Sequence, residues 1–244
     1  MIFSMGGKGG VGKTLTMVAL AECLKNFKIP LVLLDCDTEN KQKGSLCSFF
    51  PEAKKVDIRK PEGLDAFIDE SCAEGAPLVL ADLGAGSGFD AIRWFTEMHD
   101  VAKNEGLSFT AIGLVTANPG SVETVFSWGQ ELQRRVSYVI VRNLHIGPVT
   151  LWDESEVAKK FKEEFKPAVI TLEARIQDMQ TYLENNRLTM EAALKGDQEL
   201  FRRTSARLRV ESMRSRIFGQ FSGIMDVLIP EEIDETWASL RTNG

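Results

Sequence analysis

The sequence predicts an α/β protein, with a doubly wound, mostly parallel sheet, helices on both faces and a mainly helical C-terminal part. Two observations predict this class. Short, continuous apolar runs recur along the chain, and helix-length segments separate them. Parallel strands that helices cover on both faces are continuously apolar, so this alternation is typical of strand–helix–strand units. We expect one domain over residues 1–244, mainly helical from about residue 175.

The expected strands are the apolar runs, at residues 2–5, 31–35, 78–82, 109–116, 138–141 and, more weakly, 168–172. The expected helices are the amphipathic segments between them, near residues 14–26, 88–103, 121–134 and 153–164. The runs "LVLLD" (31–35) and "LVLAD" (78–82) both end in an acid, and "IFSM" (2–5) leads directly into glycines.

Composition limits the classes of protein. The net charge of −6 means that a nucleic-acid-binding role would need a local basic patch. No apolar run approaches the roughly 20 residues of a membrane span, and the motif below begins too early for a signal peptide to precede it. The four cysteines form no C-x-x-C pair. A reduced, cytoplasmic protein is therefore expected.

A phosphate-binding loop is predicted at "GKGGVGKT" (7–14), which satisfies G-x-x-x-x-G-K-[ST]. The glycines let backbone N–H groups turn toward phosphate oxygens, and the helix that follows adds its positive N-terminal end. Lys13 is expected to reach the β- and γ-phosphates of ATP, and Thr14 to offer its hydroxyl to Mg²⁺. The predicted nucleotide-binding residues of the loop are Gly7, Lys8, Gly9, Gly10, Val11, Gly12, Lys13 and Thr14.

The second lysine of this loop, Lys8, is the residue that points to a family. "KGGVGKT" (8–14) resembles the deviant Walker A motif of the ParA/MinD group of P-loop ATPases. The resemblance implies that Lys8 reaches the ATP of a partner subunit in a nucleotide-sandwich homodimer. A cation supplied in this way neutralises charge on the transferred phosphoryl group and makes hydrolysis depend on dimerisation. The alternative is that Lys8 is simply solvated.

Two further segments resemble the switch regions of that family. "LLDCDTEN" (33–40) resembles switch I, which implies that Asp37 orients the attacking water and that Asp35 supports the Mg²⁺ shell; Asn40 is a further switch candidate. "LVLADLGAGSG" (78–88) resembles the Walker B and switch II segment. There the resemblance implies that Asp82 holds Mg²⁺ through water and that the Gly86 N–H approaches the γ-phosphate.

The chain departs from the family pattern at Gly84, where proline is usual, so a looser switch II is expected. "LVTANPGSVETV" (114–125) resembles the strand and helix start beside the dimer interface of MinD-like proteins. "VIVRNLH" (139–145) resembles the strand end whose asparagine reads adenine, which would be Asn143. A turn residue is the alternative for this asparagine. The matches cover about residues 1–145.

Several relatives lack support in the residues. Iron proteins of the nitrogenase type need two cluster-ligating cysteines in the switch regions, and the two segments quoted above contain a single cysteine, Cys36. Tail-anchored-protein targeting factors and iron–sulfur carriers use C-x-x-C, and bacterial tyrosine kinases carry a tyrosine cluster; this chain has neither. MinD ends in a basic membrane helix, whereas residues 230–244 here are acidic, so no membrane binding is expected.

A basic segment, "LFRRTSARLRVESMRSRIF" (200–218), is the candidate DNA-binding surface. On one helix its arginines would form two stripes beside a buried row of Val210, Met213 and Ile217. ParA-like dimers bind DNA nonspecifically through C-terminal basic residues, and the resemblance implies such contacts here. An ordinary amphipathic helix flanked by arginines is the alternative. One stripe would hold Arg202, Arg209 and Arg216, and the other Arg203, Arg207 and Arg214.

Together these features favour a dimerising Mg²⁺-ATPase that resembles ParA and is weakly active without a protein partner. Such an ATPase would position a cargo such as a plasmid, a chromosome region or a conjugation apparatus. Two alternatives stay open. One is a MinD-like adaptor that acts through a protein partner without DNA or membrane. The other is a metabolic P-loop enzyme of the same superfamily, such as a carboxylating or amidating synthetase.

Overall fold

The computed structural model describes residues 1–37, 44–72, 78–173, 177–196 and 198–229. Within these ranges seven strands form one sheet in the order β3-β2-β4-β1-β5-β6-β7, and every neighbouring pair is parallel. The predicted fold class is confirmed. The strands are β1 (Ile2–Ser4), β2 (Val32–Cys36), β3 (Lys54–Lys55), β4 (Val79–Leu83), β5 (Thr110–Val115), β6 (Ser137–Asn143) and β7 (Ala168–Leu172).

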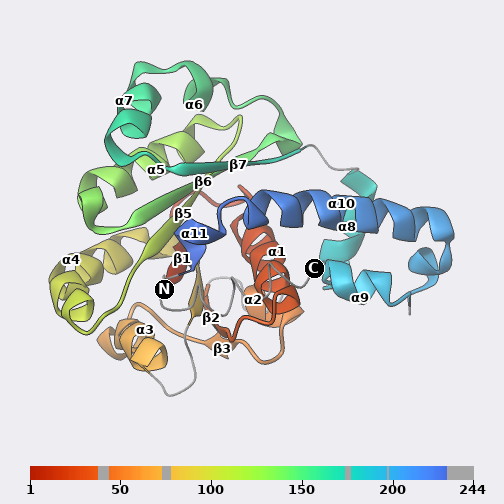
Figure 1. The fold of residues 1–244 in the computed structure, drawn as a ribbon, viewed down its shortest axis with the longest axis horizontal. Coiled ribbons are helices and arrows are strands. Elements are labelled where there is room, and N and C mark those ends of the chain that lie inside the picture. The colour runs from red at the N-terminus through yellow and green to blue at the C-terminus, as the bar shows by residue number, and fades with distance from the viewer. Residues whose placement is uncertain (38–43, 73–77, 174–176, 197, 230–244) are drawn as a thin grey trace.

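Helices cover both faces of the sheet (Figure 1). One hydrophobic cluster joins one sheet face to α1 and to the C-terminal helices, and a second joins the opposite face to the helices between β3 and β7. The first group is α1 (Lys13–Asn26), α2 (Leu46–Phe49), α8 (Gln177–Asn185), α9 (Met190–Leu194), α10 (Thr204–Ser222) and α11 (Met225–Leu228). The second is α3 (Pro61–Cys72), α4 (Gly88–Asn104), α5 (Pro119–Leu132), α6 (Thr150–Glu154) and α7 (Glu156–Phe165).

The structure contains elements that were not expected and divides one that was. Strand β3 was not expected, because it has only two residues, both exposed lysines without an apolar pattern. Helix α3 was not expected either. The single helix expected near 153–164 is two helices, because the chain is extended at Ser155, whose hydroxyl accepts a hydrogen bond from the Ala158 N–H (3.2 Å) and caps α7.

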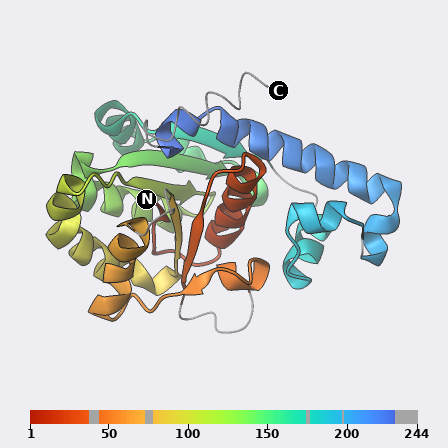
Figure 2. The same ribbon diagram turned by 60° about the horizontal axis from the view of Figure 1, so that its bottom comes forward.

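The helical C-terminal part packs on α1, the helix that follows the phosphate loop. Val210 and Ile217 of α10 are buried in the same cluster as α1, as the apolar row predicts, with Met213 half-buried beside them. Glu22 of α1 is buried and accepts hydrogen bonds from the Met190 N–H (3.1 Å) and the Glu191 N–H (2.8 Å) at the start of α9. Figure 2 shows α8 and α9 beneath the outer part of α10, away from the sheet.

The topology fixes where a ligand can bind. Strand β1 lies between β4 and β5, so the connections on its two sides run in opposite directions. In open parallel sheets this reversal leaves a crevice at the carboxyl ends of the strands. The loop after β1 and the segments after β2 and β4 all begin at this edge. None of the described helices is long and apolar enough to cross a membrane.

Candidate functional site

The glycine-rich loop connects β1 to α1 and has the backbone that such a loop requires. Gly10 and Gly12 have φ values of 73° and 94°, in the left-handed region where a side chain would be strained. Gly12 is the N-cap of α1, so the helix begins at Lys13, with its free N–H groups and positive dipole end at the loop. The predicted loop residues therefore lie together at the carboxyl edge of the sheet.

Helix α5 packs against this loop and supports it. The Trp128 indole N–H donates to the Gly6 carbonyl (2.8 Å), and both groups are buried. A Cβ on Gly7 would lie 2.6 Å from the Thr124 Cγ2, so the loop approaches α5 more closely than any other residue at that position allows. Sequence analysis missed Trp128 and Thr124 as supporting residues. The segment 114–125, which includes Thr124, was expected beside the dimer interface, and Trp128 lies beyond it.

The two lysines of the loop have different surroundings. Lys13 is half-buried, and its Nζ donates to the Lys8 carbonyl (2.9 Å). Burial lowers the pKa of Lys13, although the carboxylates of Asp82 and Asp37 act to raise it. Lys8 has an exposed side chain, and no residue in the described ranges forms an ion pair with it. Lys13 is thus held inside the site, while Lys8 faces outward.

Asp82, at the end of β4, fits a Mg²⁺ site. Its Oδ1 accepts a hydrogen bond from the Ser4 hydroxyl (2.9 Å), and that hydroxyl also accepts from the Leu83 N–H (2.9 Å). Its Oδ2 is buried and has no hydrogen-bond partner among the described residues. The Thr14 side chain lies close enough to act on the pKa of this carboxyl. Thr14 and Asp82 would hold Mg²⁺, which supplies positive charge to the β- and γ-phosphates when bound.

Burial raises the pKa of Asp82 to about 6, with the Thr14 and Ser4 side chains acting in the opposite direction. The Asp82 carboxyl therefore stays protonated up to a higher pH in the folded protein than in the unfolded chain. Its stability should fall as the pH rises from about 4 to above 6. Relative to Asp82→Asn, the wild type should lose up to about 3 kcal/mol of unfolding free energy over this range. Urea unfolding of both proteins at pH 4 and pH 8 measures the difference between their unfolding free energies. The same difference at both pH values would contradict the raised pKa of Asp82.

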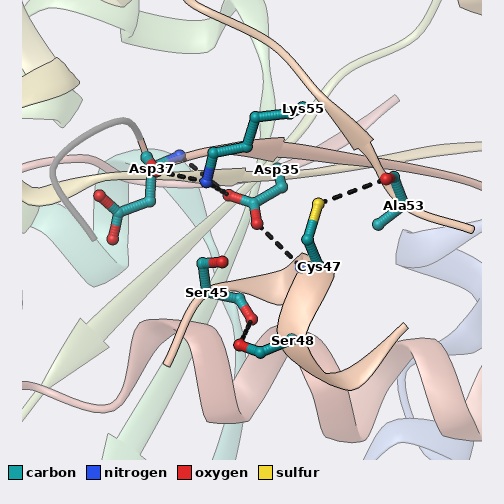
Figure 3. A network of polar contacts seen from close by, with 7 residues as sticks. All are labelled: Asp35, Asp37, Ser45, Cys47, Ser48, Ala53 and Lys55. Carbon is teal, nitrogen blue, oxygen red and sulfur yellow. Dashed lines mark hydrogen bonds and ion pairs between the residues drawn. The ribbon is translucent and has the colours of Figure 1, made fainter. Parts of the chain in front are cut away.

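Asp35 and Asp37, at the end of β2, belong to one network of polar contacts (Figure 3). Asp35 is fully buried; its Oδ1 accepts from the Lys55 ammonium (2.9 Å) and the Asp37 N–H (3.2 Å), and its Oδ2 from the Cys47 N–H (2.8 Å). Burial acts to raise the pKa of Asp35, but the hydrogen bonds from Cys47 and Lys55 hold it below its ordinary value. Asp35 is therefore a charged residue that organises the end of β2. Its part in the Mg²⁺ shell stays a prediction.

Gly84, Gly86 and Asn143 lie at the same edge. Gly86 is exposed in a short 3-10 helix, η1 (Ala85–Ser87), directly after Gly84. The Asn143 side chain closes the end of the phosphate loop: its Nδ2 donates to the Val11 carbonyl (3.0 Å), and its Oδ1 accepts from the His145 N–H (3.2 Å). Its adenine contact stays a prediction. Asn40 lies outside the described residues.

The C-terminal part departs from the two expected arginine stripes at Arg202. Residues 199–202 are a separate 3-10 helix, η4 (Glu199–Arg202), and α10 begins only at Thr204 with Arg203 as its N-cap. The prediction that Arg202 shares one helix with Arg209 and Arg216 is wrong, because the backbone is extended at Arg203 between η4 and α10. The Arg203 carbonyl accepts a hydrogen bond from the Arg207 N–H (3.2 Å), so Arg203, Arg207 and Arg214 follow one helix as expected.

Two of the six arginines are engaged by the fold. Arg214 is half-buried; it donates to the Asn26 Oδ1 (2.7 Å), and its guanidinium lies over the Phe218 ring, 4.4 Å from the centroid. Arg216 pairs with Glu173 (2.7 Å). Four arginines are exposed, and their side chains form no hydrogen bond or ion pair with a described residue: Arg202, Arg203, Arg207 and Arg209.

A parallel sheet with a glycine-rich loop, a lysine at the helix start and a buried aspartate on the neighbouring strand defines a P-loop nucleotide-binding protein. Residues 2–196 match the family model described as CbiA: CobQ/CobB/MinD/ParA nucleotide binding domain. The chain belongs to this family, and the resemblance stated from the sequence is confirmed. A comparison with curated proteins gave no match.

Solved structures share the fold at low sequence identity. The MinD cell division protein of Aquifex aeolicus is 15% identical, with 89% of this chain and 96% of that chain covered and a TM-score of 0.50. The septum site-determining protein MinD of Pyrococcus horikoshii, solved with Mg-ADP, is 12% identical, with 88% and 94% covered and a TM-score of 0.53. At these identities the likeness supports the fold.

Proposed function

We propose that the chain is a cytoplasmic Mg²⁺-ATPase of ParA type, which dimerises with ATP and separates after hydrolysis to ADP and phosphate. In this proposal the ATP state positions or partitions a cargo such as plasmid DNA, a chromosome region or a conjugation apparatus. Lys13 neutralises the β- and γ-phosphates, Asp37 orients the attacking water, and a protein partner raises a weak basal rate.

The observation that carries the proposal is the contrast between the two lysines of the loop. Lys13 is turned inward beside Asp82 and Asp37, whereas Lys8 is exposed beside the start of α5, with no ion pair to a described residue. Lys13 alone supplies the cation that the loop needs for the phosphates of the nucleotide bound in the same subunit. The outward lysine is placed where a second subunit across the loop could use it.

The dependence of ATP turnover on protein concentration tests this proposal. If two subunits complete each site, turnover per subunit should rise with protein concentration and level off once the dimer is formed. A constant turnover per subunit over a wide concentration range would contradict the dimer. No turnover at any concentration, with Mg²⁺ and ATP, would remove the ATPase assignment.

The DNA-binding part of the proposal rests on the four exposed arginines around the start of α10. Arg207→Glu with Arg209→Glu should abolish ATP-dependent retardation of an arbitrary duplex and leave basal ATP turnover unchanged, because the change lies away from the phosphate loop. The matched control is Lys159→Glu with Lys160→Glu on α7, which alters net charge equally on the opposite face of the sheet. Equal loss with both pairs would show that only net charge matters.

The MinD-like adaptor is the second candidate, and the engagement of Arg214 and Arg216 favours it. With these two arginines held by Asn26 and Glu173, the basic surface is smaller than the sequence indicates. If the wild type with ATP does not retard DNA at low salt, the adaptor is the better assignment. Its partner would then be a protein.

A further inference from the structure

The short strand β3 brings a lysine to the end of β2. In the parallel pairing of β2 with β3, Lys55 is the register partner of Asp35. Its ammonium donates both to the Asp35 Oδ1 (2.9 Å) and to the Asp37 carbonyl (2.5 Å). Because the Asp37 N–H also donates to the Asp35 Oδ1, the Asp37 backbone is held at both its N–H and its carbonyl (Figure 3).

The Asp37 side chain lies against the other switch segment. A Cβ on Gly84 would be 2.9 Å from the Asp37 Oδ1 and 3.1 Å from its Cα, so the bare glycine leaves the space that this residue occupies. Gly84 has φ −62° and ψ 167°, an extended backbone that many residues adopt. Space beside Asp37, not backbone strain, is therefore the reason that a side chain is excluded here.

We propose that Lys55 is a positioning residue for Asp37. Lys55 holds the Asp37 backbone, and the missing side chain of Gly84 leaves the space that the Asp37 carboxylate occupies. The inference rests on the proposed function, because a kinetic effect follows only if Asp37 orients the attacking water. The Asp37 carboxylate is close enough to Lys13 to raise the pKa of that lysine. A shift of the Asp37 backbone would therefore move this carboxylate relative to the phosphate loop. Lys55 itself contacts Asp35 and the Asp37 backbone.

Removal of the ammonium in Lys55→Met should lower kcat for ATP by roughly ten- to a hundredfold, the cost of misplacing a reacting group by about 1 Å. The dissociation constant for ATP should change little, because Lys13 and the loop are untouched. Lys55→Arg should restore much of the rate. The matched control is Lys54→Met, on the same strand, which loses only an exposed pair with Glu70.

Hydrogen exchange provides a readout that does not depend on turnover. The Asp37 amide should exchange roughly fivefold faster in Lys55→Met than in Lys54→Met, the factor that corresponds to one net hydrogen bond. If Lys55→Met alone does not fold because Asp35 is left charged and buried, the double variant with Asp35→Asn is compared with Asp35→Asn alone, since Asp35 itself accepts the Asp37 N–H. A wild-type exchange rate at Asp37 in a folded variant would overturn the proposal.

Gly84→Ala tests the same position from the opposite side. It should lower kcat by roughly tenfold or more, because the new Cβ displaces the Asp37 carboxylate. Gly219→Ala, on α10, is the control and should keep the wild-type kcat, since a Cβ there meets nothing within 4 Å.

The outcomes separate the two proposals. If the wild type hydrolyses ATP, Asp37→Ala is inactive and Lys55→Met has the wild-type kcat, the positioning role is wrong and the ATPase stands. If the wild type shows no turnover, the ATPase is wrong, and the exchange rate at Asp37 alone decides whether Lys55 positions that residue.

Discussion

Replacement of Lys13 by alanine is expected to abolish binding of Mg-ATP. Lys13 is the half-buried cation of the loop, and its removal leaves the β- and γ-phosphates without a matching charge beside Asp82 and Asp37. Loss of one partner from such a charged contact costs about 3 kcal/mol or more, which is at least a hundredfold in affinity. Titration calorimetry with ATP and Mg²⁺ measures the affinity of both proteins.

The matched control is Lys25→Ala, near the C-terminal end of the same helix, where the lysine pairs with exposed Glu52. It should bind ATP as the wild type does. Wild-type affinity in Lys13→Ala would show that the loop does not bind phosphate in the way proposed.

Replacement of Lys8 by alanine is expected to leave ATP affinity nearly unchanged and to lower ATP turnover at least a hundredfold. A cationic side chain supplied to the transferred phosphoryl group by a partner is worth roughly a thousandfold or more in other phosphoryl-transfer enzymes. Lys13 and the glycines remain for binding. Turnover and affinity are measured on the same preparation, and wild-type turnover would show that Lys8 is only solvated.

Mixing two inactive variants distinguishes action on the partner from action within one subunit. In a heterodimer of Lys8→Ala with Asp37→Ala, the subunit that keeps Asp37 receives Lys8 from its partner, so one complete site is formed. Activity should therefore reappear on mixing. If the mixture stays inactive while each variant still dimerises, Lys8 acts within its own subunit.

The sequence predicted the parts of the site that local patterns encode. The loop after β1, the aspartates at the ends of β2 and β4, and the glycine at position 12 follow from residues adjacent in the chain. All of them lie at the carboxyl edge of the sheet, because parallel strands bring their carboxyl ends together.

Other parts depend on contacts between distant residues, which no single segment contains. Lys55 meets Asp35 only because a two-residue strand pairs with β2, and an exposed lysine pair has no strand pattern. Trp128 supports the loop across 122 positions in the chain.

The prediction for Arg202 failed for a related reason. A helical projection of residues 200–218 assumed one continuous helix, whereas the extended backbone at Arg203 separates η4 from α10. It also could not show that Arg214 and Arg216 reach Asn26 and Glu173, which come from other elements.

Sedimentation velocity of the wild type tests the central claim, an ATP-dependent dimer, most directly. The protein is compared in Mg²⁺ with ADP and in Mg²⁺ with an ATP analogue whose γ-phosphate cannot be transferred. The account predicts a monomer with ADP and a dimer with the analogue. The same sedimentation coefficient for the wild type in both nucleotides would contradict it.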